Sequence, residues 1–152
     1  MRAVLCVIPL MLVLGACGSA PNPGPKTKVA AVDQGWYKQA VEDLAMLEGE
    51  ADKLFAAGRK DDAADLIQKA EPLASRVLGV PRPTLAATEA ASDLDHLYGR
   101  MLLSNRRYGW ARLEFQKNLV RWKYWQPQTA ETARRLQQAK AAIAECDKHI
   151  QD

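Results

Sequence analysis

Apolar residues recur every three or four positions through most of the chain, and this spacing predicts helices. Between clusters of Gly and Pro, the chain is filled with Ala, Leu, Glu, Gln, Lys and Arg, which favour helices. The first predicted helix covers about 33–57 and ends at Gly58. Its recurring apolar positions are Tyr37, Ala40, Val41, Leu44, Leu47, Ala51, Leu54 and Phe55. We therefore expect an all-α domain over residues 33–152.

The second and third helices are delimited by proline and by capping residues. The second begins near Asp61, which we expect to cap its N-terminus. Pro72 should kink or divide this helix, because an internal proline removes a hydrogen bond and clashes with the preceding turn. Pro81 and Pro83 make a firm break, after which Thr84 caps a third helix that runs to about Ser104.

The fourth helix is predicted over about 107–125 and the fifth over about 129–149, with Gln126-Pro127 between them. The inward positions of the fourth are Tyr108, Ala111, Phe115, Leu119 and Trp122. Those of the fifth are Ala133, Leu136, Ala139, Ile143, Cys146 and Ile150. The short spacings predict an antiparallel array of about five helices.

The amino-terminal segment, 1–16, has another pattern. Arg2 precedes an uncharged apolar run, Ala3 to Leu14, which is shorter than the roughly 20 residues that a membrane-spanning helix needs. It therefore indicates a secretion signal. Its end, Leu14-Gly15-Ala16-Cys17, resembles the lipobox of bacterial lipoproteins. The resemblance implies removal of residues 1–16 and acylation of Cys17; an ordinary cleavable signal with an incidental cysteine is the alternative.

Residues 17–32 are rich in Pro, Gly, Ser and Ala and predict an extended tether. Gly18 and Ser19 follow Cys17, and the lack of Asp there resembles the sorting pattern of outer-membrane lipoproteins. The resemblance implies a chain bound to membrane lipid through acylated Cys17, at the periplasmic face of the outer membrane in a cell with two membranes.

The charge balance of the chain excludes one class of function, the nucleic-acid-binding proteins. The chain has 21 Lys and Arg against 18 Asp and Glu, and loses only Arg2 with the signal. This near balance lacks the dense positive charge of a nucleic-acid-binding protein, so we expect no nucleic-acid partner.

About 120 residues after the tether suffice for one domain. After cleavage, Cys146 would be the only cysteine besides Cys17, and we expect it to be buried and inert.

Two segments look alike. Leu54 to Ala63, followed by Ile67 and Ala70, resembles the middle of a tetratricopeptide repeat. Leu102 to Asn118 is similar, with Tyr108, Ala111 and Phe115 in register. Arg107 stands near the place of the usual turn glycine, Asn118 replaces the usual alanine, and the spacing from Ala63 to Ala111 is longer than that of a regular repeat. The resemblance implies degenerate repeats; a plain helical bundle is the alternative.

The densest aromatic and basic cluster is Arg121 to Trp125, and Trp110 lies on the same predicted helix. Trp122 continues the inward face, whereas the other rings point elsewhere. Such residues are typical of interface hot spots. The candidate partner-binding residues are Trp110, Arg121, Lys123, Tyr124 and Trp125. Alternatively, the rings cap the core against the fifth helix or rest on a membrane surface.

Glu89, Asp93 and His96 share a helix face, which we interpret as solvated because no second element is seen to converge on it. The chain has no nucleophile elbow, phosphate-binding glycine loop or paired-cysteine metal site, so we expect no enzyme, cofactor or metal. The leading hypothesis is a membrane-anchored scaffold that binds another envelope protein or a peptide. The alternatives are a small-ligand or glycan binder that uses Trp110, Tyr124 and Trp125, and an enzyme with an unrecognised site.

Overall fold

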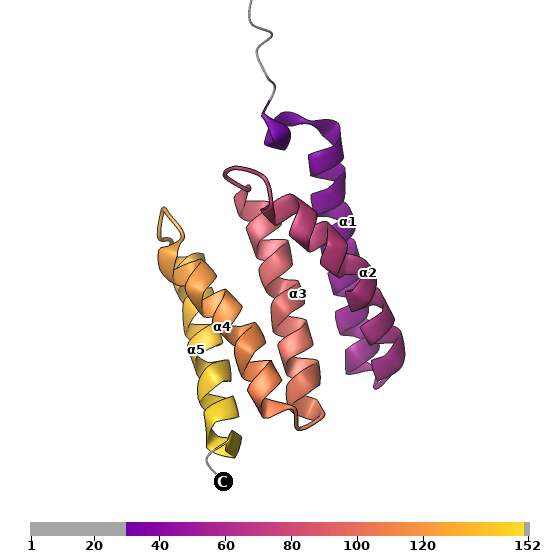
Figure 1. Cartoon of the computed structure of the whole chain (residues 1–152), viewed down its shortest axis with the longest axis vertical. Helices are drawn as coiled ribbons and strands as arrows, with labels where there is room; N and C mark the ends of the chain where they lie inside the picture. The colour runs from indigo at the N-terminus through magenta and orange to yellow at the C-terminus, as the bar shows by residue number, and fades with distance from the viewer. Residues whose placement is uncertain (1–29, 151–152) are drawn as a thin grey trace, which may run out of the picture.

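The computed structural model describes residues 30–150, and all regular structure in this range is helical (Figure 1). A short 3-10 turn precedes five α-helices. The bounds are η1 Ala31–Asp33, α1 Gly35–Ala56, α2 Lys60–Leu78, α3 Leu85–Ser104, α4 Tyr108–Tyr124 and α5 Ala130–Ile150. The predicted all-α class and its five helices are confirmed. The predicted signal (1–16), Cys17 and nearly all of the tether (17–32) lie outside the described residues.

The helices run alternately up and down as an antiparallel array (Figure 1). Helix α1 packs on α2 and α3, α3 packs on α2 and α4, and α5 packs on α4. The start of α1, the α2–α3 loop and the α4–α5 loop therefore lie at one end of the array, and the other two turns lie at the opposite end (Figure 1).

The α1–α2 and α3–α4 turns have the same backbone geometry. Arg59 N donates to Leu54 O at 2.9 Å, and Arg107 N donates to Leu102 O at 2.9 Å. The residue before each donor is left-handed, with φ of 79° at Gly58 and 58° at Arg106. This geometry ends a helix and allows the chain to reverse its direction. Arg106, rather than Arg107, thus occupies the place of the turn glycine.

The expected N-cap of α2 is wrong, and of the two effects expected of Pro72, kinking or dividing the helix, division does not occur. The helix begins at Lys60 after Arg59 and has no side-chain cap, so Asp61 lies within its first turn. There its carboxylate interacts favourably with the positive, N-terminal end of the helix dipole. Pro72 lies inside α2 without dividing it, and its ring is exposed. By contrast, the predicted cap of α3 is confirmed, because the Thr84 side chain accepts a hydrogen bond from Ala87 N at 3.2 Å.

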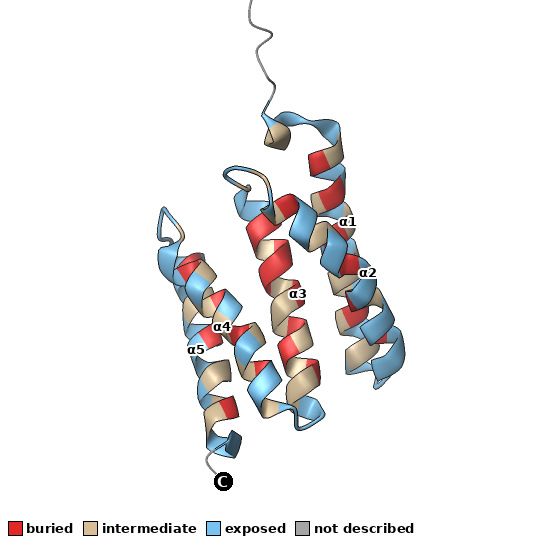
Figure 2. Cartoon of the chain, viewed as in Figure 1, coloured by how far each residue is buried: buried red, intermediate tan, exposed pale blue. Residues whose placement is uncertain are grey.

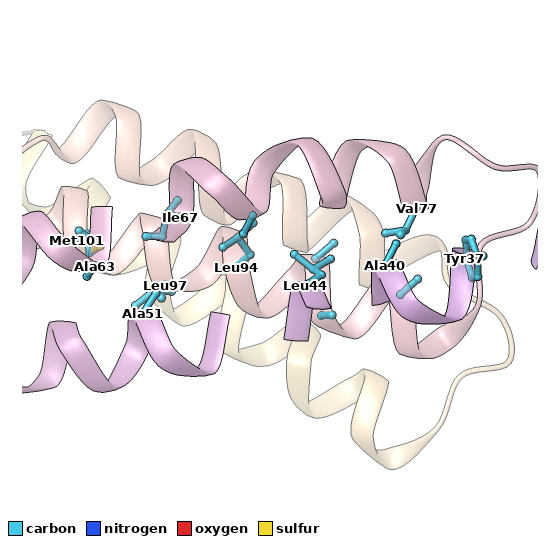
Figure 3. Packing of buried hydrophobic residues seen from close by; sticks show 14 residues of the cluster. Tyr37, Ala40, Leu44, Ala51, Ala63, Ile67, Val77, Leu94, Leu97 and Met101 are labelled. Carbon is cyan, nitrogen blue, oxygen red and sulfur yellow. The ribbon is translucent and has the colours of Figure 1, made fainter. Parts of the chain in front are cut away.

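Buried residues lie mainly on the helix faces that are turned towards neighbouring helices (Figure 2). The larger cluster joins α1, α2 and α3 (Figure 3). Its buried members are Tyr37, Ala40, Leu44, Ala51, Ala63, Ile67, Ala70, Val77, Ala87, Ala90, Ala91, Leu94, Leu97 and Met101. A second cluster joins α4 to α5 through Ala111, Phe115 and Cys146. Cys146 is fully buried, as predicted, and burial raises the pKa of its thiol.

Helices α3 and α4 are in close contact at Gly99 of α3 and Phe115 of α4. A Cβ atom added there would meet Phe115 Cζ at 2.7 Å and Cδ1 at 2.9 Å. When the two turns are superposed in register, the equivalent positions of the first helix pair are Ala51 and Ile67, which are both buried in the larger cluster. The second unit thus pairs glycine with phenylalanine where the first unit pairs alanine with isoleucine.

Candidate functional site

The structure distributes the five predicted partner-binding residues over several environments. Trp110 and Tyr124 are exposed at 66% and 69%, and Lys123 is exposed with its ammonium 5.2 Å from the Tyr124 ring centroid. Trp110 and Tyr124 lie about 21 Å apart along α4 at 1.5 Å per residue. Trp125 is half-buried, with its ring edge-on to fully buried Trp122 at 6.2 Å between centroids. The three rings therefore do not converge on one site of small-ligand size.

Arg121 holds α4 to α3. Its Nη2 donates to Asp95 Oδ2 at 2.8 Å, and its Nη1 donates to Asn118. Asn118 in turn donates from Nδ2 to Ser92 O at 2.8 Å. Trp122 Nε1 donates to Ser92 Oγ at 2.8 Å. These bonds satisfy the buried polar atoms of the α3–α4 contact, so Arg121 and Asn118 stabilise the array.

An apolar stripe runs along the outer side of α4. Its residues are Trp110, Leu113, Lys117, Val120 and Tyr124, and we call them the outer stripe. Spacings of three and four place them on one side of the helix, away from buried Ala111 and Phe115. Leu113 and Val120 are exposed at 49% and 54%. The sequence interpretation missed these two residues, although their spacing from Trp110 was visible.

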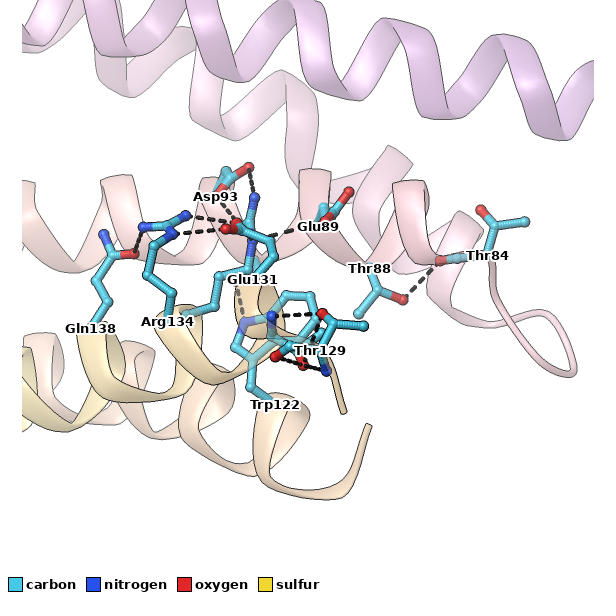
Figure 4. Close-up of polar contacts among 12 residues, drawn as sticks. Thr84, Thr88, Glu89, Asp93, Trp122, Thr129, Glu131, Arg134 and Gln138 are labelled. Atoms are coloured by element: carbon cyan, nitrogen blue, oxygen red, sulfur yellow. Dashed lines mark hydrogen bonds and ion pairs between the residues drawn. The ribbon is translucent and has the colours of Figure 1, made fainter. Parts of the chain in front are cut away.

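Arg135 of α5 is the centre of a polar network that includes Glu89 and Asp93 of α3 and Glu131 of α5; Figure 4 labels these three partners. The Arg135 side chain is only 13% exposed, and Nη1 donates to Asp93 Oδ1 at 2.6 Å. Its Nε donates to Glu131 Oε1 at 2.8 Å, and the guanidinium lies 5.4 Å from the Trp122 ring centroid. The α3 face with Asp93 is thus bound across helices, which corrects its interpretation as a merely solvated face.

His96 belongs to the same side of α3. Its Nε2 lies 3.0 Å from Gln138 Nε2 of α5, and its ring is 5.4 Å from the Phe115 ring. Burial, together with the positive charge of Arg100, lowers the pKa of His96. Arg100 Nη1 donates to Asp52 Oδ1 at 2.7 Å and so connects α3 to α1. The polar contacts continue along this side from α1 to α5.

A groove of about 340 Å³ lies between α1, α3 and α5. We call it the α1–α3–α5 groove. Its lining residues are Val41, Glu42, Ala45, Glu48, Ala86, Glu89, Ala90, Asp93 and Arg135. Four carboxyl groups and one guanidinium thus line the groove. The guanidinium pairs with Asp93 and Glu89, and Glu42 pairs with Lys38. The groove attracts cations, and its alanines leave room for a main chain to approach.

Glu48 is the most perturbed group of this groove. Burial, with the negative charges of Asp93 and Asp52, raises its pKa to about 7. None of the hydrogen bonds or ion pairs in the described part of the chain involves its carboxyl group. A cationic partner beside Glu48 would stabilise the charged form and lower this pKa.

Two absences concern the described residues alone. Between residues 30 and 150, His, Cys, Asp and Glu side chains do not gather in a group of three or more that could hold a metal ion. Within that range, the helices are also too short or too polar to cross a membrane.

Comparison with known protein families, with curated proteins and with solved structures finds no match to this chain. The assignment of a function therefore depends on the groove, the outer stripe and the amino-terminal sequence.

Proposed function

We propose that this protein is a lipid-anchored scaffold of the bacterial envelope that binds an extended, basic segment of another envelope protein. The observation that carries this proposal is the α1–α3–α5 groove, which is lined by the four carboxyl groups of Glu42, Glu48, Glu89 and Asp93 and by one cation, Arg135. The anchor is Cys17, at the end of the lipobox-like sequence.

The groove favours a main chain in extended form. Ala45, Ala86 and Ala90 project only a methyl group, so backbone atoms of a ligand can approach α1 and α3. Its volume is at the lower end of the roughly 300–1,000 Å³ that is typical of ligand sites, enough for a few side chains at a time. Lysine or arginine side chains of such a segment would pair with Glu42 and Glu48 at the walls.

Anchoring at Cys17 supplies the location. A single acyl chain binds a bilayer only marginally, with a constant on the order of 10⁴ M⁻¹, so stable attachment requires two or more chains. The lipobox resemblance implies that number. The groove is then held at the membrane, where partners that carry basic segments are met at high effective concentration.

Binding in the groove is tested with two fluorescein-labelled peptides of equal length, alternating Lys-Ala and alternating Glu-Ala, by fluorescence anisotropy. We expect the Lys-Ala peptide alone to bind, and Glu48→Lys to weaken it about tenfold or more. Glu50→Lys is the matched control, because it makes the same charge change on α1 outside the groove. Ala45 is exposed and lines the groove, so Ala45→Phe places a bulky ring in the groove and should also weaken binding.

Equal weakening by Glu48→Lys and Glu50→Lys would show that binding depends only on net charge, and would contradict binding of the peptide in the groove. The anchor is tested separately with Cys17→Ser in cells. After a wash in about 1 M salt, which removes peripheral proteins, the wild type should stay in the membrane fraction and the variant should not. Retention of a cleaved Cys17→Ser chain after that wash would overturn the lipid anchor.

A further inference from the structure

We propose that the outer stripe of α4 lies on the surface of an anionic lipid bilayer. The stripe has exposed aromatic rings near both ends, Trp110 and Tyr124, and half-exposed aliphatic side chains, Leu113 and Val120, between them. Aromatic rings with a polar edge are favoured at the boundary between lipid and water, and aliphatic side chains are favoured just below it.

Charge gives the stripe its preferred surface. Lys123 near the end of α4, and Arg106 and Arg107 directly before the helix, are exposed cations with no carboxylate partner among residues 30–150. The other cations of α4, Arg112, Lys117 and Arg121, are paired with Asp147, Glu114 and Asp95. Helices α1, α2 and α3 together carry 12 acidic and 6 basic side chains. An anionic surface therefore attracts the α4 side and repels the α1–α3 part, which orients the array with the outer stripe towards lipid.

Lys117, at the middle of the stripe, argues against a second copy of the chain as the occupant. Two copies related by a twofold axis, with antiparallel α4 helices, would place one Lys117 beside the other, which is unfavourable. At a bilayer the same side chain can lie along the stripe with its ammonium towards phosphate groups. Its present partners, Glu114 and Asp95, lie on the flank of the stripe.

The length of chain before the helices allows this contact. Residues 17 to 30 span at most about 45 Å, and α4 is about 25 Å long. The start of α1 also lies at the same end of the array as the C-terminus of α4 (Figure 1). A chain acylated at Cys17 can therefore lay α4 along the membrane that holds it; this step rests on the proposed anchor.

The test uses the chain from residue 17 onward with Cys17→Ser, so that no acyl chain contributes. Every residue of the two apolar clusters lies at or after Val32, so the chain from residue 17 onward retains every described core contact. Vesicles of phosphatidylglycerol and phosphatidylethanolamine are compared with vesicles of phosphatidylcholine by flotation and by tryptophan fluorescence. We expect binding to the anionic vesicles alone, a blue shift of the emission, and weakening by salt.

Variants identify the surface. Trp110→Ala with Tyr124→Ala should lower the partition constant at least tenfold, whereas Met46→Ala, at an exposed position of α1, should leave it unchanged. Lys123→Glu should lower it on the order of tenfold, since each charge near an anionic surface contributes about fivefold. Lys38→Glu makes the same charge change on exposed α1 and should have little effect. Circular dichroism confirms that each variant is folded.

Absence of binding to anionic vesicles, or equal binding by wild type and the double variant, would overturn the proposal. A dimer in sedimentation equilibrium that the double variant abolishes, without vesicle binding, would assign the stripe to a second copy and overturn it too. Failure here is distinguishable from failure of the groove, because the double variant should bind the Lys-Ala peptide normally and Ala45→Phe should bind vesicles normally.

Discussion

The contact between Gly99 of α3 and Phe115 of α4 offers a sharp test of the packing, through Gly99→Ala. The added methyl group would lie 2.7 Å from Phe115 Cζ, well inside normal contact. Phe115 cannot move aside easily, because it is fully buried and its ring packs beside His96. We therefore expect α3 and α4 to be forced apart.

The magnitude follows from two opposing effects. Replacing a glycine inside a helix by alanine stabilises the helix by up to about 1 kcal/mol. Overpacking a close contact typically costs about 1–3 kcal/mol. The net expectation is a loss of about 1–2 kcal/mol in the free energy of unfolding. For a domain of this size, with an unfolding entropy of about 0.25 kcal/mol/K, the melting temperature falls by roughly 4–8 °C.

Thermal unfolding followed by circular dichroism measures the effect, with Gly49→Ala as the matched control. Gly49 also lies inside a helix, but a Cβ added there would meet nothing within 4 Å. This control should raise the melting temperature by a few degrees. Adding Phe115→Ile to Gly99→Ala recreates the Ala51 and Ile67 combination of the first unit, and should recover part of the loss.

If Gly99→Ala raises the melting temperature as much as Gly49→Ala does, the close approach of α3 and α4 is wrong. If Phe115→Ile gives no recovery in the presence of Gly99→Ala, the methyl group is not meeting the Phe115 ring.

Three other changes have expected outcomes. Ala111→Leu should destabilise the fold by about 1–3 kcal/mol in urea unfolding, because Ala111 is fully buried between α4 and its neighbours; wild-type stability would contradict that position. Trp125→Ala should lose about 1–2 kcal/mol through its edge contact with Trp122, whereas exposed Trp110→Ala should change stability by less than about 0.5 kcal/mol, and equal losses would refute the assignment. The pKa of Glu48 is raised from 4.5 to about 7 in the folded chain, so its contribution to stability is present below about pH 4.5 and lost as pH rises through 7. Glu48→Gln should therefore raise the melting temperature at pH 8 and not at pH 4, and a pH-independent difference would argue against this shift.

The candidate site was only partly visible in the sequence. The exposed rings of Trp110 and Tyr124 were identified, and so was the inward position of Trp122. Arg121 was assigned to the same patch, yet it binds Asp95, which lies on the neighbouring helix α3. A local cluster of residue types indicates which side chains are close in sequence, but it does not show which of them the neighbouring helix occupies.

The sequence by itself determined the helices, because the three-and-four spacing of apolar residues and the breaks at Gly and Pro are local properties. The predicted fourth helix, about 107–125, differs only at its terminal positions from α4, Tyr108–Tyr124. It also determined most of the inward positions, as Ala63, Ala111 and Cys146 are all fully buried. The predicted inward face of the fifth helix is wrong at Ala133 and Ile150, which are exposed.

Only the tertiary structure decided which polar groups meet. The groove joins Glu48 of α1, Asp93 of α3 and Arg135 of α5, which lie far from one another along the chain. Their convergence depends on the angles and distances at which the helices pack, and these follow from the sizes of the buried residues, such as small Gly99 against large Phe115. Periodicity assigns a residue to a face, but packing decides what that face meets.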